Sequence, residues 1–189
     1  MARNVIALHG FAGSSIDEIA RAAQMSVGAI YLHFRSKDDL CVSLVEDALD
    51  QAVNEMASPG AASPHRCLAA SWGRLVAWAD EGDHARILRV LAGSRARAQL
   101  SAEVVTAIAR GTDRAKRHLA ACVQAGSDAG LYRGVNAQQV SEALWALLLG
   151  CLDAADIQAN LGGPAVPLAE RAQQGFALIE HALLLTCPA

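Results

Sequence analysis

Residues 14–40 read SSIDEIARAAQMSVGAIYLHFRSKDDL, and this stretch decides the fold. Ser15 stands three residues before Glu18, which is the spacing of a capping box, where a hydroxyl and a carboxylate satisfy orphan amides at a helix start. The apolar residues that follow fall on one helical face: Ile16, Ile19, Ala20 and Ala23. This pattern predicts a short amphipathic helix.

A second short helix is predicted directly after it, with Ser26 as its cap. Its inward stripe is expected to be Val27, Ile30, Tyr31 and Phe34. Ser36 and Asp39 then predict another capping box, at the start of a third helix. Two short helices across a turn of a few residues, the second exposing small and polar side chains, are typical of a helix-turn-helix reader of the DNA major groove.

The run SVGAIYLHFRSKDDL at residues 26–40 resembles the N-terminal DNA-binding domain of the TetR family of transcriptional regulators. The resemblance is specific over residues 5–47 and weaker beyond, where it rests on length, helicity and amphipathic final helices. It implies an all-α protein, with a three-helix helix-turn-helix domain over residues 1–47. A helical ligand-binding and dimerisation bundle would follow over residues 48–189.

Candidate DNA contacts follow from this pattern. The exposed face of the second helix is expected to be Val27, Gly28, Ala29, Leu32 and His33. Small residues there let the backbone approach base edges, and Val27 or Ala29 can contact a thymine methyl. The resemblance assigns phosphate contacts to Tyr31, His33 and Lys37, with the Ser15 and Ser26 helix starts beside them. The simpler alternative is that these are ordinary surface residues.

Two features depart from the family pattern. Gln24 stands where the family usually has glycine in a left-handed turn, at a cost of about 1 kcal/mol if φ is positive. A first helix is expected at residues 3–9, ending at Gly10, and it is shorter than the family's by about two turns. Either the native chain extends upstream of Met1 or this domain is unusually small.

After a Pro- and Gly-rich linker at 58–64, helices are expected over 65–81, 84–97, 101–129, 137–160 and 167–185. The last two have long apolar faces, which the family uses to form a four-helix dimer interface. The interface positions predicted on these helices are Leu144, Leu148, Cys151, Phe176, Ile179 and Leu183.

Members of the family bind small, often apolar effectors inside the bundle. Candidate lining residues are Trp72, Trp78, His118, Cys122 and Trp145, with Met56, Cys67 and Tyr132 as further possibilities. Taken singly, each of these residues is more typical of an ordinary core or surface position than of a ligand-binding site. His118 and Cys122 lie four apart on one predicted helix, but two ligands are too few for a metal site, so no metal or cofactor is expected.

Composition narrows the class further. The 189 residues have a net charge of −3 and only 4% aromatics, and residues 1–47 are not basic, so DNA affinity would rest on a few placed contacts and on dimerisation. Five scattered cysteines without a CxxC pair predict reduced, buried thiols in a cytoplasmic protein. No apolar run is long enough for a membrane span, and no signal peptide is recognised.

The sequence thus predicts a homodimeric, ligand-responsive transcriptional repressor that binds a palindromic double-stranded DNA operator and releases it on binding a small-molecule effector. A small all-α enzyme is the second reading, but no nucleophile–base pair or carboxylate cluster supports it, so no catalytic residues are assigned. The third is a dimeric helical ligand-binding or interaction protein whose shortened head no longer binds DNA.

Overall fold

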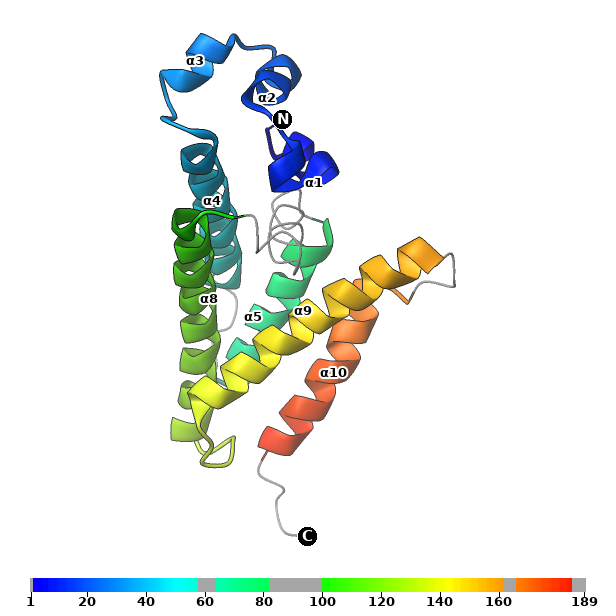
Figure 1. The fold of residues 1–189 in the computed structure, drawn as a ribbon. Coiled ribbons are helices and arrows are strands. Elements are labelled where there is room, and N and C mark those ends of the chain that lie inside the picture. The colour runs from blue at the N-terminus through cyan, green and yellow to red at the C-terminus, as the bar shows by residue number, and fades with distance from the viewer. Residues whose placement is uncertain (1, 58–63, 82–99, 162–165, 185–189) are drawn as a thin grey trace. The chain divides into compact units, whose positions relative to one another are not determined.

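A computed structural model describes residues 2–57, 64–81, 100–161 and 166–184. In these ranges the chain is helical apart from its turns and one isolated bridge between Tyr132 and Leu184, which confirms the all-α prediction. The helices, labelled in Figure 1, are α1 (Ala2–Gly13), α2 (Ile16–Ala23), α3 (Val27–Tyr31), α4 (Lys37–Ala57), α5 (Pro64–Glu81), α8 (Ala102–Asp128), α9 (Ala137–Leu161) and α10 (Leu168–Leu183). The helix predicted over 84–97 lies outside the described residues.

The chain divides into two compact units. The first unit contains Met1–Ala52 and Glu81–Asp113, and the second contains Val53–Asp80 and Arg114–Ala189. Helices α4 and α8 therefore each contribute residues to both units. The boundary predicted between residues 47 and 48 falls inside α4, so as a functional division it stays a prediction.

The core of the first unit is built around α1, α2, α3 and the first turns of α4. Its buried side chains include Ile6, Phe11, Ile19, Ile30, Leu40 and Leu49. The expected break at Gly10 is present, with φ 72° and ψ 173°, but helical turns resume beyond it and α1 ends at Gly13. Arg3 forms an ion pair with Asp47 on α4, which joins α1 to that helix.

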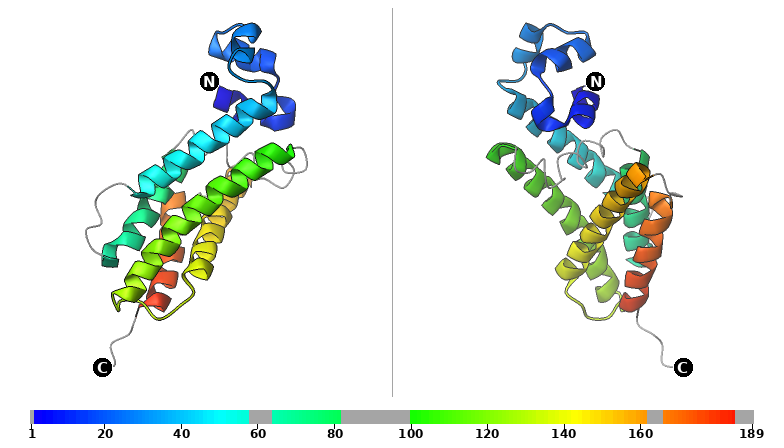
Figure 2. Two further views of the ribbon diagram at one scale, coloured as in Figure 1. Left: turned by 90° about the vertical axis from the view of Figure 1, so that its left-hand side faces the viewer. Right: turned by 45° about the vertical axis from the view of Figure 1, so that its right-hand side comes forward.

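The second unit has an aromatic centre. Trp72 of α5 is fully buried and stacks on Phe176 of α10, with ring centroids 5.6 Å apart and planes 12° from parallel. Helices α9 and α10 pack side by side as an antiparallel pair, which Figures 1 and 2 both show. Offset aromatic stacking and dense aliphatic packing are the main stabilising contributions expected in such a core.

The predicted dimer positions require a correction. Five of the six are buried within this chain: Leu144, Leu148, Cys151, Phe176 and Leu183. Ile179 is half-buried. These side chains form the core of their own unit, because helical periodicity marks an apolar face without showing whether the chain itself or a partner covers it.

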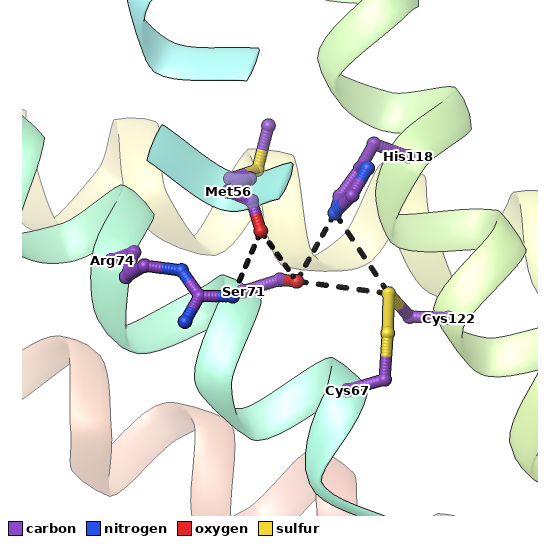
Figure 3. The surroundings of a disulfide bond; sticks show 6 residues. All are labelled: Met56, Cys67, Ser71, Arg74, His118 and Cys122. Carbon is purple, nitrogen blue, oxygen red and sulfur yellow. Dashed lines mark hydrogen bonds between the residues drawn. A yellow bond between two sulfur atoms is a disulfide. The ribbon is translucent and has the colours of Figure 1, made fainter. Parts of the chain in front are cut away.

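The cysteine prediction is also corrected. Cys67 of α5 and Cys122 of α8 form a disulfide, with α-carbons 5.6 Å apart and a sequence separation of 55 (Figure 3). Cys41 and Cys151 are free and buried as expected, and burial raises the pKa of the Cys41 thiol to about 12. Sequence spacing missed the pair because its partners come from different helices.

No helix in the described ranges combines the length and the apolar character that crossing a membrane requires.

Gly126 tests the packing of the second unit. A Cβ added there would overlap the ring of the buried Tyr132, whereas one added at the exposed Gly73 of α5 meets nothing within 4 Å. We expect Gly126→Ala to lower the free energy of unfolding by about 1–3 kcal/mol, because the ring has to move. Gly73→Ala should raise it by about 0.5–1 kcal/mol, since alanine favours the helix. Urea denaturation followed by circular dichroism measures both, and equal stability of the two variants would contradict the packing.

Candidate nucleic-acid interface

The start of α2 is fixed by the capping box that the sequence predicted. The Ser15 hydroxyl accepts a hydrogen bond from the Glu18 amide at 3.2 Å, and the Ser15 amide donates to the Glu18 carboxylate at 2.9 Å. The Ser15 hydroxyl also donates to that carboxylate at 3.0 Å. The bond from the Ser15 backbone, followed by the one from its hydroxyl, holds the pKa of Glu18 below its usual value. The hydroxyl predicted to approach a phosphate is thus engaged within the cap.

Gln24 ends α2 in the left-handed conformation, with φ 57° and ψ 36°. The Gln24 amide donates to the carbonyls of Ala20 and Arg21, and the Met25 amide donates to the Ala20 carbonyl at 2.9 Å. These bonds satisfy carbonyls that the helix end would leave without partners. The conditional prediction for this turn is confirmed, because a non-glycine residue here has positive φ at a cost of about 1 kcal/mol.

Helix α3 ends at Tyr31, about one turn before Phe34, the last residue of the predicted apolar stripe. Ser26 caps it, accepting a bond from the Ala29 amide at 3.1 Å, but the helix ends at Tyr31 and only Ile30 is buried. The assignment of Tyr31 to the inward stripe was therefore wrong, since its side chain is 53% exposed. Phe34 is half-buried beyond the helix end. A five-residue helix has little stability of its own, so caps and neighbours hold it.

Most of the residues expected on the outer face of the second short helix, α3, are exposed. Gly28, Tyr31, Leu32 and His33 are exposed, with Leu32 at 83%, while Val27 and Ala29 are half-buried. A Cβ at Gly28 would meet only the Ser26 hydroxyl at 3.9 Å, so the backbone is open to approach at this point. Figure 1 shows α2 and α3 joined by their short turn. This geometry matches a helix whose first residues approach base edges.

Lys37 has a different role in the structure from the one predicted. Its ammonium donates to the carbonyls of Phe11 at 2.8 Å and Ser14 at 3.0 Å, and lies 4.4 Å from the centre of the Phe11 ring. These carbonyls end α1, where a cation is favoured by the helix dipole and by hydrogen bonding. Lys37 thus joins the start of α4 to the end of α1 within the first unit.

The cap of α4 differs in one detail from the expected box. The Ser36 hydroxyl accepts from the Asp39 amide at 3.0 Å, as predicted. The Asp39 carboxylate, however, accepts from the Arg35 amide at 2.9 Å, one residue before the position that a capping box uses. Both bonds fix the direction in which the chain leaves the α3 region and enters α4.

The predicted effector residues fall into separate places within the second unit. His118 and Cys122 lie together with Ser71, Met56 and Cys67 (Figure 3). Trp72 is stacked in the core and Trp78 is buried, and in the described part of the chain both indole N–H groups lack a hydrogen-bond partner. Trp145 is half-buried on α9. Two buried donors without acceptors are a feature that a polar ligand atom would relieve.

An open groove in the first unit was not expected from the sequence. It encloses about 410 Å³ and is lined by Asp39, Val42, Ala102, Glu103, Thr106 and Arg110. Its residues come from the start of α4 and the start of α8, which are more than sixty positions apart in the chain. No local pattern signals such a pairing, because it depends on how the two helices pack.

The fold and this surface together define a class: a helix-turn-helix protein with an attached helical bundle. Residues 1–44 match the family described as bacterial regulatory proteins, tetR family. This match covers the helix-turn-helix region and shows that residues 1–44 are similar to the DNA-binding part of that family.

A curated relative and two solved structures extend the comparison. The fatty acid metabolism regulator protein of Bacillus subtilis (strain 168) is 36% identical over 52 residues, a match covering 28% of this chain and 27% of that protein. The matched segment therefore spans only about a quarter of the relative's length.

The solved structures cover nearly the whole chain. The transcriptional regulator FadR of Bacillus subtilis, in complex with stearoyl-CoA, has a TM-score of 0.78 and 18% identity over 96% of this chain and 95% of that one. SmeT in complex with triclosan has a TM-score of 0.81 and 20% identity over 97% and 88%. SmeT is described as the repressor of the multidrug efflux pump SmeDEF of Stenotrophomonas maltophilia. At these identities the likeness shows a shared fold.

Lys37 can be tested as a structural residue. Lys37→Met should lower the free energy of unfolding by about 1–3 kcal/mol, because two carbonyls at the end of α1 lose their charged donor. Arg35→Met is the matched control, since Arg35 is exposed, and it should change stability by less than about 0.5 kcal/mol. Urea denaturation measures both. If the two variants are equally stable, the structural role of Lys37 is rejected and a phosphate contact becomes its favoured role.

Proposed function

We propose that this protein is a homodimeric DNA-binding transcriptional repressor that a small-molecule effector releases from its operator. The observation that carries the proposal is the α2–turn–α3 unit, capped at both helix starts and exposing Gly28, Leu32 and His33. A regulator of this kind works on chromosomal DNA, which places it in the cytoplasm under this proposal. The proposal contains no catalytic step.

DNA recognition would rest on α3 in the major groove. Gly28 allows close approach of the backbone, and the exposed Leu32 offers an apolar surface to a thymine methyl. The exposed Tyr31 hydroxyl and His33 ring are suited to phosphate oxygens. None of these side chains gives the bidentate pairing of Arg, Asn or Gln, so sequence preference would draw in part on DNA shape.

Dimerisation would use the outer face of α9 rather than the buried positions first predicted. Ala146, Gly150, Ile157 and Leu161 are exposed on this face, with Ile157 58% and Leu161 79% exposed. Asp153 is the charged residue in the same row. On α10, Leu178 is 75% exposed. A second copy of the chain is the occupant we assign, because a two-fold operator requires two recognition helices about 34–36 Å apart.

Effector binding would take place in the second unit. The buried indole N–H groups of Trp72 and Trp78 supply donors inside a largely apolar core. The complexes of FadR with stearoyl-CoA and SmeT with triclosan support a ligand with substantial apolar surface. Such a ligand acts by differential affinity, stabilising the form of the dimer that does not fit the operator.

Gly28→Glu tests the DNA interface. The added side chain has room, so the fold should be kept, but its carboxylate would face the DNA. We expect affinity for DNA flanking the protein's own gene to fall by at least about 100-fold, since like-charge contacts cost several kcal/mol. Fluorescence anisotropy at two salt concentrations, with nonspecific competitor, measures this.

Gly73→Glu is the matched control for that experiment, because Gly73 is also exposed on a helix with open space around it, on α5. It should bind DNA as the unaltered protein does. Equal affinities of the two variants would overturn the assigned docking face. Absence of specific binding by the unaltered protein, on its own flanking DNA and on a genomic operator selection, would favour the DNA-inactive alternative.

Leu161→Glu tests the dimer. A charge at this exposed position of α9 should convert the protein to a monomer at micromolar concentration, because desolvating an unpaired carboxylate opposes association. Val105→Glu is the control, since Val105 is 44% exposed on α8, and that variant should stay dimeric. Sedimentation velocity distinguishes the two species. A dimer that persists in Leu161→Glu would place the interface elsewhere.

A further inference from the structure

The two cysteines of the disulfide have different surroundings. Cys67 is in the first turn of α5 and is half-buried, while Cys122 is on α8 and is 3% exposed. The start of a helix favours a thiolate over a thiol. Cys67 is therefore the more exposed of the two residues and lies at a helix start, and Cys122 is enclosed beside it. This arrangement differs from that of the free cysteines Cys41 and Cys151, which are both buried.

A hydrogen-bonding group surrounds the enclosed sulfur (Figure 3). His118 lies one turn before Cys122, with its Nε2 atom 3.9 Å from the Cys122 sulfur. The Ser71 hydroxyl is 3.1 Å from the same nitrogen and 3.7 Å from that sulfur, and it donates to the Met56 carbonyl at 3.2 Å. Arg74 donates to the same carbonyl at 2.9 Å.

These contacts suit His118 to accept a proton. Burial, followed by the positive charge of Arg74, lowers the pKa of His118, which favours the neutral imidazole. A neutral Nε2 can take the proton of the Cys122 thiol. The new N–H then donates to the Ser71 oxygen, whose own hydrogen is already directed to Met56. Each polar group in the cluster keeps a partner after the transfer.

We propose that Cys67 and Cys122 form a reversible dithiol–disulfide pair that hydroperoxides oxidise, with Cys67 as the attacking thiol, Cys122 as the resolving thiol and His118 as the acceptor of its proton. In the first step the Cys67 thiolate attacks the hydroperoxide, an S–O bond forms as the O–O bond breaks, and the alkoxide or hydroxide that leaves takes a proton from solvent water, so that Cys67 becomes a sulfenic acid. In the second, the Cys122 thiolate attacks the Cys67 sulfur, the S–S bond forms as the S–O bond of the sulfenic acid breaks, and the leaving hydroxide takes the proton that His118 had accepted and departs as water. The net reaction consumes two thiols and one hydroperoxide.

Reversibility rests on the proposed function, because a regulator acting on chromosomal DNA lies in a reducing compartment where lasting structural disulfides are rare. Cellular dithiols would return the pair to its reduced form by thiol–disulfide exchange. Oxidation covalently joins α5 to α8, and Ser71 extends the same cluster to the last turn of α4. An oxidant thereby acts on the unit in which we place the effector.

Mass spectrometry of the full-length protein tests the proposal without DNA. Protein reduced with dithiothreitol is treated with equimolar hydrogen peroxide, alkylated under denaturing conditions and digested. We expect a linked Cys67–Cys122 peptide that dithiothreitol converts back to two alkylated thiols. Cys122→Ser should instead accumulate a dimedone-reactive sulfenic acid on Cys67. Cys151→Ala, the control, should form the same linked peptide as the unaltered protein.

A linked peptide involving another cysteine would overturn the proposal, and so would oxidation of Cys67 no faster than that of Cys41 and Cys151. His118→Gln separates a chemical from a structural role of the histidine. It should slow disulfide closure by at least about tenfold while leaving sulfenic acid formation on Cys67, measured in the Cys122→Ser background, unchanged. A merely structural role would change both rates or neither. Because no readout uses DNA, failure here leaves the DNA-binding test to stand separately.

Discussion

The helix-turn-helix of this protein depends on how its short helices end. Helix α2 has eight residues and α3 has five, and neither length is stable alone in water. Ser15 with Glu18, and Ser26 with Ala29, satisfy the first amides, while the left-handed Gln24 satisfies the last carbonyls of α2. Lys37 does the same for the end of α1. These side chains set the turn that exposes Gly28 and Leu32.

The second unit combines an apolar core with a buried polar cluster. Its core is aromatic and aliphatic, centred on Trp72 and Phe176. A polar cluster of Ser71, His118 and Cys122 nevertheless lies within it, and its members contact one another. A buried polar network costs stability unless its groups are paired, and here each member has a partner within the cluster, so the network can persist among apolar helices.

The sequence predicted correctly those features that depend on interactions between residues close together in the chain. The Ser15–Glu18 capping box, the break at Gly10 and the left-handed Gln24 each depend on residues within four positions, and the structure shows them. Lys37 was assigned to phosphate because motif position cannot reveal that carbonyls 23 and 26 residues earlier in the chain accept its hydrogen bonds. The same limit moved Leu144 and Leu148 from a supposed interface into the core.

The sequence by itself determined the helical class and the helix-turn-helix with its likeness to the tetR family, because caps, turns and periodic apolar faces depend on short-range spacing. Tertiary structure alone decided which apolar faces the chain covers itself, which leaves Ile157 and Leu161 outside. It also brought Cys67 to Cys122 across 55 positions. Such pairings depend on how whole helices pack, and no spacing rule encodes that over such separations.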